Sequence, residues 1–304
     1  MNAARASRGG PRATTRHRAA LVPRAAGDPP LLLAFDVGTS VGSAGVARGQ
    51  ELLAHAYLLN SREQAARLVP VCAGVLDEAG VAAADLDGVV VGKGPGSFTG
   101  LRIAAATARG IGAGLQVPVW PQSSLAAAAV SAWAPVPRAR DGSPASPPLA
   151  ADPAPGSGID AALLSAGTDP GLRHVLFDAG GDRVYAAAYR FRPTAGASAH
   201  GRDRGAVETV LEPRAATVGE ILRLGPPRMA LFAGDGALRH ARTLEAAGFR
   251  VLRYPAGVPT AAAHLRLHAL LPNEEPEVAG GRWQPDYLRG SSARPPLGSG
   301  ERSR

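Results

Sequence analysis

The sequence has only one cysteine, Cys72, among 304 residues, and it has no long apolar run. A single cysteine excludes an intrachain disulfide framework and fits a reducing compartment, and we expect Cys72 to be a core residue rather than a nucleophile. No run approaches the roughly 18 apolar residues that span a bilayer, and the N-terminus lacks the apolar segment of a secretory signal. We therefore expect a soluble, cytoplasmic protein with no membrane contact.

Lysine is almost absent, since Lys93 is the only one among 33 basic residues, yet the formal net charge is +8. Most of this excess lies at the two ends, because residues 1–30 carry six arginines against Asp28 and residues 290–304 carry three against Glu301. Such ends can attract RNA phosphates or form an organellar transit peptide. The interpretation we favour is a disordered basic extension over 1–30, or a start codon placed too far upstream, with a disordered tail over 291–304.

The hydrophobic pattern predicts an α/β protein. Runs at 31–35, 43–48 and 51–58 read as three antiparallel strands, with a hairpin turn at Gly49 and Gln50. The period then becomes helical over 61–79, where Pro70 is expected to cause a kink. A strand at 89–91, a helix from about Thr99 to Gly114, a strand at 117–120 and a helix at 123–132 follow. This βββαβαβα order over residues 31–133 is the half-domain pattern of the actin/hexokinase (ribonuclease H-like) superfamily.

A second, degenerate half is expected over residues 159–290. Its predicted elements are a hairpin across Gly180 and Gly181 that joins 174–178 to 183–191, a strand at 229–233, helices at 236–247 and 260–271, and a last element at 283–288. Residues 134–158 are rich in Pro, Ala, Ser and Gly and predict a low-complexity insertion. Residues 193–206 predict a further loop.

The most informative string is Gly-Lys-Gly-Pro-Gly-Ser-Phe-Thr-Gly-Leu-Arg-Ile, residues 92–103, between a buried strand and a helix. Its backbone N–H groups at a helix start could bind an anion. The loop could equally only turn the chain and pack Phe98 beneath the helix, and the residues alone leave both readings open. A Walker A loop is excluded because no Gly-Lys-Ser/Thr closes the string.

This string closely resembles the GxGPGSFTGLR motif of the TsaB/YeaZ family. Weaker resemblances flank it at Arg62–Pro70, at Val175–Ala179 with Val184–Tyr185, at Gly234–Gly236 and at Pro285–Arg289, so that the likeness covers roughly residues 31–290. The sequence departs from the family pattern at Gln64, where histidine is common, and at Asp182–Arg183. The TsaB/YeaZ resemblance implies an actin/hexokinase-like fold.

The resemblance also implies a function. TsaB-type proteins are non-catalytic subunits of the complex that installs threonylcarbamoyl on N6 of the adenosine 3′ of the anticodon in tRNA. The implied partners are the transferase TsaD, the ATPase subunit TsaE and a second copy of the chain, with tRNA reached through the complex. ATP and metal are expected on TsaD, and no cofactor is expected on this chain.

Asp36-Val37-Gly38-Thr39-Ser40 resembles the first phosphate loop of superfamily ATPases. This suggests an alternative function, a free-standing ATP-dependent small-molecule kinase that uses Asp36 as its metal-site acid. The candidate phosphate contacts are Asp36, Gly38, Thr39, Gly94, Pro95, Gly96, Ser97, Phe98, Thr99, Gly100 and Arg102. Against a kinase, the second half has no clear glycine-rich adenosine loop, because Gly234 and Gly236 are only a remnant.

Metal-binding motifs are missing. The His-x-x-x-His helix of TsaD corresponds here to Gln64 and Leu68, and leucine binds no metal. His264 and His268 could share a helix face, but two ligands are too few for zinc, so a structural role is favoured. No HExxH string is present.

We therefore expect the helices of the first half to bind a partner protein. Ala104, Ala108 and Gly112 recur at helical spacing, and such a small face lets helices approach closely. The face could pack on its own sheet or on a partner, and the family resemblance favours a partner. The expected partner interface comprises Arg62, Gln64, Leu68, Val69, Cys72, Ala104, Thr107, Ala108 and Ile111.

Overall fold

The computed structural model describes residues 28–59, 64–133, 172–191, 207–228, 230–271, 274–277 and 283–288. The predictions for residues 1–27, for the loops at 134–158 and 193–206, for the tail from 291 and for Arg62 lie outside this part of the chain. Among the described residues, no helix combines the length and apolarity that crossing a membrane requires.

The first half forms a five-stranded mixed sheet in the order β3-β2-β1-β4-β5. Strands β1, β2 and β3 pair antiparallel, whereas β4 and β5 add in parallel. The elements are β1 (Leu31–Asp36), β2 (Gly42–Arg48), β3 (Glu51–Leu58), α1 (Gln64–Glu78), the 3-10 turn η1 (Ala83–Asp85), β4 (Gly88–Gly94), α2 (Phe98–Leu115), β5 (Val119–Ser123) and α3 (Ser124–Trp133). The predicted βββαβαβα order is confirmed, and α1 continues through Pro70.

The second half repeats this arrangement, in the order β10-β9-β6-β7-β8. Its elements are β6 (Leu172–Asp178), β7 (Arg183–Phe191), β8 (Val207–Thr217), α5 (Val218–Arg223), β9 (Leu231–Ala233), α6 (Asp235–Arg239), α7 (Ala241–Ala246), β10 (Arg250–Val251) and α8 (Ala261–Leu270). Strands β9 and β10 have three and two residues, where β4 and β5 have seven and five. The second half is therefore a shortened copy of the first.

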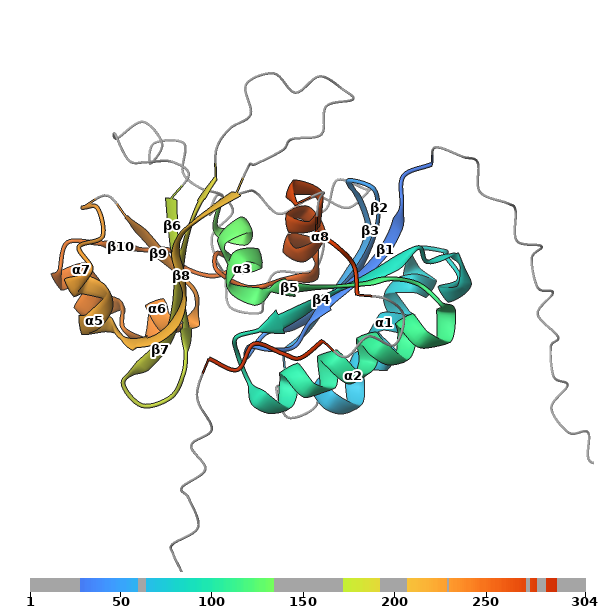
Figure 1. Ribbon diagram of the computed structural model, residues 1–304, viewed down its shortest axis with the longest axis horizontal. Helices are drawn as coiled ribbons and strands as arrows, with labels where there is room; N and C mark the ends of the chain where they lie inside the picture. Colours follow the sequence, from blue (N-terminus) through green and yellow to red (C-terminus); the bar gives the residue numbers. More distant parts are fainter. Residues whose placement is uncertain are drawn as a thin grey trace, which may run out of the picture.

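Two helices lie between the sheets and join the halves (Figure 1). Helix α8, from the end of the second half, packs on β1, β2 and β4 of the first sheet, and α3 packs on β6 and β7 of the second. The first five residues of strand β1 are all apolar because both faces of the strand are covered. Leu33 and Phe35 face α1 and α2, whereas Leu32 and Ala34 face α8. Both faces of the first sheet are covered, and each half completes the core of the other.

Candidate functional site

The motif loop between β4 and α2 packs directly on the turn after β1. The Ser97 N–H donates a hydrogen bond of 2.7 Å to the Gly38 carbonyl oxygen. A Cβ on Gly96 would lie 2.2 Å from that oxygen, and a Cβ on Gly100 would lie 2.0 Å from the Val37 carbonyl oxygen. No side chain fits in either place. The motif glycines are therefore needed for the close approach of the two loops.

The backbone donors of this loop are used inside the chain. The Gly94 N–H donates to Ser124 Oγ at 3.1 Å, and the Gly100 N–H donates to Ser97 Oγ at 3.3 Å, which caps α2. Of the two readings of the motif, the geometry favours the turn over the anion cradle. One part of the turn reading is wrong, because Phe98 does not lie beneath the helix and is 57% exposed.

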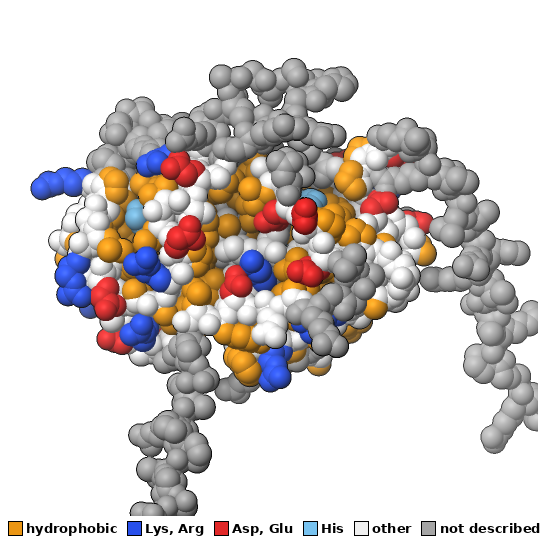
Figure 2. Space-filling model, in the orientation of Figure 1, with side chains coloured by type: hydrophobic (Ala, Val, Ile, Leu, Met, Phe, Trp, Pro, Cys, Tyr) orange, Lys and Arg blue, Asp and Glu red, His pale blue; other side chains and the backbone are white. Residues whose placement is uncertain are grey.

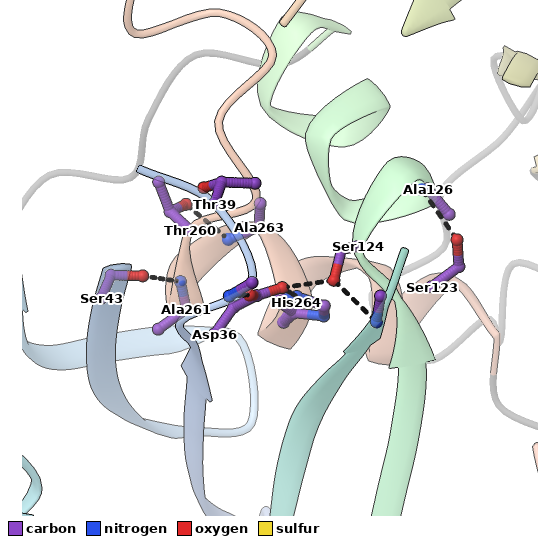
Figure 3. Close-up of polar contacts among 12 residues, drawn as sticks. Asp36, Thr39, Ser43, Ser123, Ser124, Ala126, Thr260, Ala261, Ala263 and His264 are labelled. Atoms are coloured by element: carbon purple, nitrogen blue, oxygen red, sulfur yellow. Dashed lines mark hydrogen bonds and ion pairs between the residues drawn. The ribbon is translucent and has the colours of Figure 1, made fainter. Parts of the chain in front are cut away.

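Asp36, at the end of β1, is the centre of a buried polar network (Figure 3). Its Oδ1 accepts the Gly38 N–H at 2.6 Å, and its Oδ2 accepts the Ser124 hydroxyl at 2.6 Å and His264 Nε2 at 2.9 Å. The Asp36 side chain is 1% exposed and His264 is fully buried. The network thus connects β1 with the start of α3 and with α8, at the junction of the two halves.

This network leaves Asp36 unsuited to hold a catalytic metal. Both carboxylate oxygens already accept hydrogen bonds, and the carboxylate is enclosed by protein. A Cβ on Gly92 would lie only 2.0 Å from Asp36 Oδ2, so the neighbouring strand also closes on it. The kinase alternative, which uses Asp36 as an accessible metal-site acid, therefore conflicts with the geometry.

His264 and His268 do not form a metal pair. His264 points to Asp36, whereas the ring of His268 packs on Trp120 with 4.8 Å between centroids. Within the described ranges, no group of three or more His, Cys, Asp and Glu side chains is placed to hold a metal ion. The structural role expected for His264 is confirmed, because it bridges the halves.

A small pocket lies where the two halves meet. It is lined by residues that include Thr39, Phe177, Asp235 and Tyr254, and it has no room for a water molecule. Burial raises the pKa of Asp235 above its ordinary value.

The glycines of the second half contribute to this closure. A Cβ on Gly234 would lie 2.4 Å from the Leu176 carbonyl oxygen, and one on Gly257 would lie 2.1 Å from Gly234 N. The adenosine-loop remnant therefore serves the packing of the chain on itself.

The expected partner surface requires a correction. Leu68, Cys72, Ala104 and Ala108 are buried in the chain's own core with the first sheet. A Cβ on Gly112 would lie 2.7 Å from Val119 Cγ2, so the small residues of α2 allow the helix to approach its own sheet. The core position expected for Cys72 is confirmed, because the residue is buried in this cluster, and burial raises the pKa of its thiol to about 12.

Gln64 is also an internal residue, because its Nε2 lies 3.3 Å from the carbonyl oxygens of Thr39, Ser40 and Leu58. It ties the start of α1 to the turn after β1 and to the end of β3. Of the expected interface residues, Val69 is 59% exposed, and Thr107 and Ile111 are half-buried.

A different small surface does face outward. On α1, Ala66, Val69, Ala73 and Gly74 are exposed, and on α2, Gly110, Ala113 and Gly114 are exposed, with Thr107 half-buried beside them. We call these residues the helix surface. An added Cβ on Gly74, Gly110 or Gly114 would meet no atom within 4 Å. Glycine destabilises a helix interior by about 1 kcal/mol relative to alanine, so packing inside the chain gives no reason for these three.

Replacing each of these glycines by alanine is expected to stabilise the isolated chain. Gly74→Ala and Gly110→Ala each relieve the helix-propensity cost and meet open space, which predicts a gain of about 0.5–1 kcal/mol in the free energy of unfolding. Denaturant titration measures the gain. Gly112→Ala is the matched control and should destabilise, because its Cβ would meet Val119. Destabilisation by Gly110→Ala would contradict the exposed position of the helix surface.

Fold and site together define a class. The chain is an α/β protein with two topologically equivalent halves, each with the sheet order expected of an actin/hexokinase-like half-domain, and the small pocket where they meet has no room for a water molecule.

The comparisons with known proteins show similarities over part of the chain. Residues 58–149 match the family model "TsaD: tRNA N6-adenosine threonylcarbamoyltransferase". The chain is 33% identical over 102 residues to the tRNA threonylcarbamoyladenosine biosynthesis protein TsaB of Escherichia coli, covering 34% of this chain and 44% of that protein. It is 36% identical over 103 residues to the TsaB of Haemophilus influenzae, covering 34% and 43%. The matches span less than half the length of these relatives.

Two solved structures share the fold. A Pseudomonas aeruginosa protein described as similar to peptidase YeaZ superposes with a TM-score of 0.60 at 24% identity, covering 86% of this chain and 100% of that one. YeaZ of the same organism superposes with a TM-score of 0.54 at 24% identity, covering 78% and 90%. These two structures show the fold that the chain shares with YeaZ, and the sequence matches show a partial similarity to TsaB proteins.

Proposed function

We propose that this chain is a non-catalytic subunit of the machinery that makes N6-threonylcarbamoyladenosine in tRNA, where it supports the transferase TsaD. The observation that carries the proposal is the closed junction between the halves. Asp36 is enclosed by Ser124, His264 and Gly38, and the small pocket lined by Thr39, Phe177 and Tyr254 has no room for a water molecule. Among the described residues, the acid that a kinase would use for its metal is therefore buried and hydrogen-bonded, which supports a binding role. The names of the TsaB relatives support the pathway.

The helix surface is the place where we propose that partners dock. Its exposed small residues let another helix come close, and the helix-propensity cost of three glycines is offset only when such a partner is bound. The partners are TsaD and, in its absence, a second copy of this chain, with TsaE completing the complex in the cytoplasm. ATP and metal would be held by TsaD, and tRNA would be reached through the complex.

The rival function, a free-standing small-molecule kinase, is tested on the purified chain alone. Isothermal titration with Mg·ATP and an assay of phosphate release should give no saturable binding in the cleft and no turnover. Titration with purified TsaD should give a saturable complex that gel filtration also detects. Turnover of ATP by the chain without partners, or failure to bind TsaD, would contradict the proposal.

A further inference from the structure

A groove runs along α2 and has a volume of about 680 Å³. One wall is the first half of α2, and the other is the C-terminal segment 283–288. The residues that define its chemistry are Phe98, Arg102, Ala105, Arg109, Gln284 and Tyr287. Hydrophobic and basic side chains lie next to one another at the lower edge of the molecule, where Figure 1 shows α2 (Figure 2). The size is within the range of ligand sites.

Two aromatic rings stand at the mouth of this groove. The ring of Phe98 is 57% exposed and that of Tyr287 is 42% exposed. Their centroids are 5.2 Å apart with an interplanar angle of 42°, although they come from segments far apart in the chain. Exposed aromatic rings that lie together provide a stacking surface for a planar ligand.

Two guanidinium groups accompany the rings. Arg102 is exposed and lies over the Phe98 ring at 4.9 Å from its centroid. Arg109 donates to the Trp283 carbonyl oxygen, and its Nε has no partner among the described residues.

None of the described residues that line the groove is acidic. The nearby Asp286 pairs instead with Lys93, which lies 3.5 Å away. The groove therefore combines positive charge with aromatic faces, and this combination selects a ligand that is both planar and anionic.

We propose that this groove binds single-stranded RNA, with a base stacked on Phe98 and Tyr287 and the adjoining phosphate against Arg102. Aromatic rings interleaved with arginine are how proteins hold unpaired nucleotides. A free di- or triphosphate fits less well, because the N–H groups of Gly94, Ser97 and Gly100 that could cradle it already have partners in the chain. The inference deepens the proposed function by adding a direct RNA contact, and it rests on that function for the choice of a tRNA loop as the natural strand.

The test is a titration of the full chain with a fluorescein-labelled single-stranded RNA octamer that contains 2-aminopurine. We expect anisotropy to rise saturably and the 2-aminopurine signal to be quenched by stacking. Phe98→Ala should weaken binding about tenfold and abolish the quenching, whereas Phe98→Trp should retain both. Arg102→Gln should weaken binding and reduce its salt dependence. Leu224→Ala and Arg228→Ala, at exposed positions of the second half, are the matched controls and should bind as the wild type does.

Three results would overturn the inference. The first is equal RNA affinity of the wild type, Phe98→Ala and Arg102→Gln. The second is displacement of the octamer by AMP or ATP at the same nucleotide concentration, which would make this a free-nucleotide site. The third is loss of TsaD capture by Phe98→Ala with RNA binding unchanged, which would make it a protein contact. If the wild-type chain binds TsaD but does not bind RNA, this inference is also overturned, but the proposed function still stands.

Discussion

Ala108→Arg is expected to unfold the chain, whereas Gly110→Arg, two residues further along α2, should leave it folded. Ala108 is fully buried against the first sheet, and an arginine there would bring an unpaired charge into the core. Such a change costs more than about 4 kcal/mol, a large part of the stability of a domain. Gly110 is exposed with open space around it, and arginine is a better helix former than glycine. Circular dichroism melting measures both variants.

The same pair of variants tests the docking surface. Gly110→Arg should melt at or above the wild-type temperature and should no longer form a complex with TsaD or with itself, because the long side chain blocks close approach of a partner helix. Gly110→Ala is the control for the loss of glycine and should keep most of the binding. If Gly110→Arg binds TsaD as the wild type does, the helix surface is not the interface. If Ala108→Arg melts at the wild-type temperature, then Ala108 is not packed against the first sheet as described.

The second large effect concerns His174 on β6 and the stability of the chain in acid. The ring is 7% exposed, stacks on Phe232 at 4.9 Å, and neither ring nitrogen has a partner among the described residues. Burial lowers the pKa of His174 from 6.5 to about 4. The native chain therefore keeps the ring neutral, while the unfolded chain takes up a proton below about pH 6.5.

Stability should thus be full above pH 6.5 and should fall progressively as the pH drops towards 4. The loss from His174 is about 3 kcal/mol, which corresponds to the difference between the two pKa values. His268, whose pKa burial also lowers, adds to this loss, whereas Asp235, whose pKa burial raises, opposes it at the acid end.

His174→Phe preserves the stacking on Phe232 and removes both nitrogens. Urea unfolding at pH 7 and pH 4.5 should show most of the pH dependence of the wild type lost in this variant. His268→Phe is the control and should remove a smaller part, because the burial of His268 is less complete. An unchanged pH dependence in His174→Phe would show that another group causes the acid sensitivity.

Much of the first half could be predicted from sequence, because its strands are mostly apolar and Gly49, which adopts a positive φ, marks the hairpin. Strand β8 was missed. It is an edge strand with charged residues, Pro213 and irregular pairing to β7, so its pattern resembles a loop. Strand β10 has only two residues, and the helix predicted over 236–247 is broken at His240 into α6 and α7.

The residues of the candidate site could not be brought together from the sequence alone. Ser124 lies 88 positions after Asp36 in the sequence, and His264 lies 228 positions after it. No local sequence pattern connects these three residues. The stripe of Ala104, Ala108 and Gly112 was identified correctly as a close-packing face, but helical periodicity cannot say whether such a face meets a sheet or a partner. A second stripe on the same helix, Thr107, Gly110 and Gly114, also recurs at helical spacing, and only the position of the sheet distinguishes the two.

The most direct test of the account is the formation of threonylcarbamoyladenosine in unmodified tRNA by purified TsaD and TsaE, measured with and without this chain. With threonylcarbamoyl-adenylate supplied, we expect modification to depend on the chain in stoichiometric amount and to be lost with Gly110→Arg but not with Gly110→Ala. The chain alone should neither modify tRNA nor hydrolyse ATP. Modification at the full rate without the chain, or ATP turnover by the chain alone, would contradict its assignment as a non-catalytic subunit.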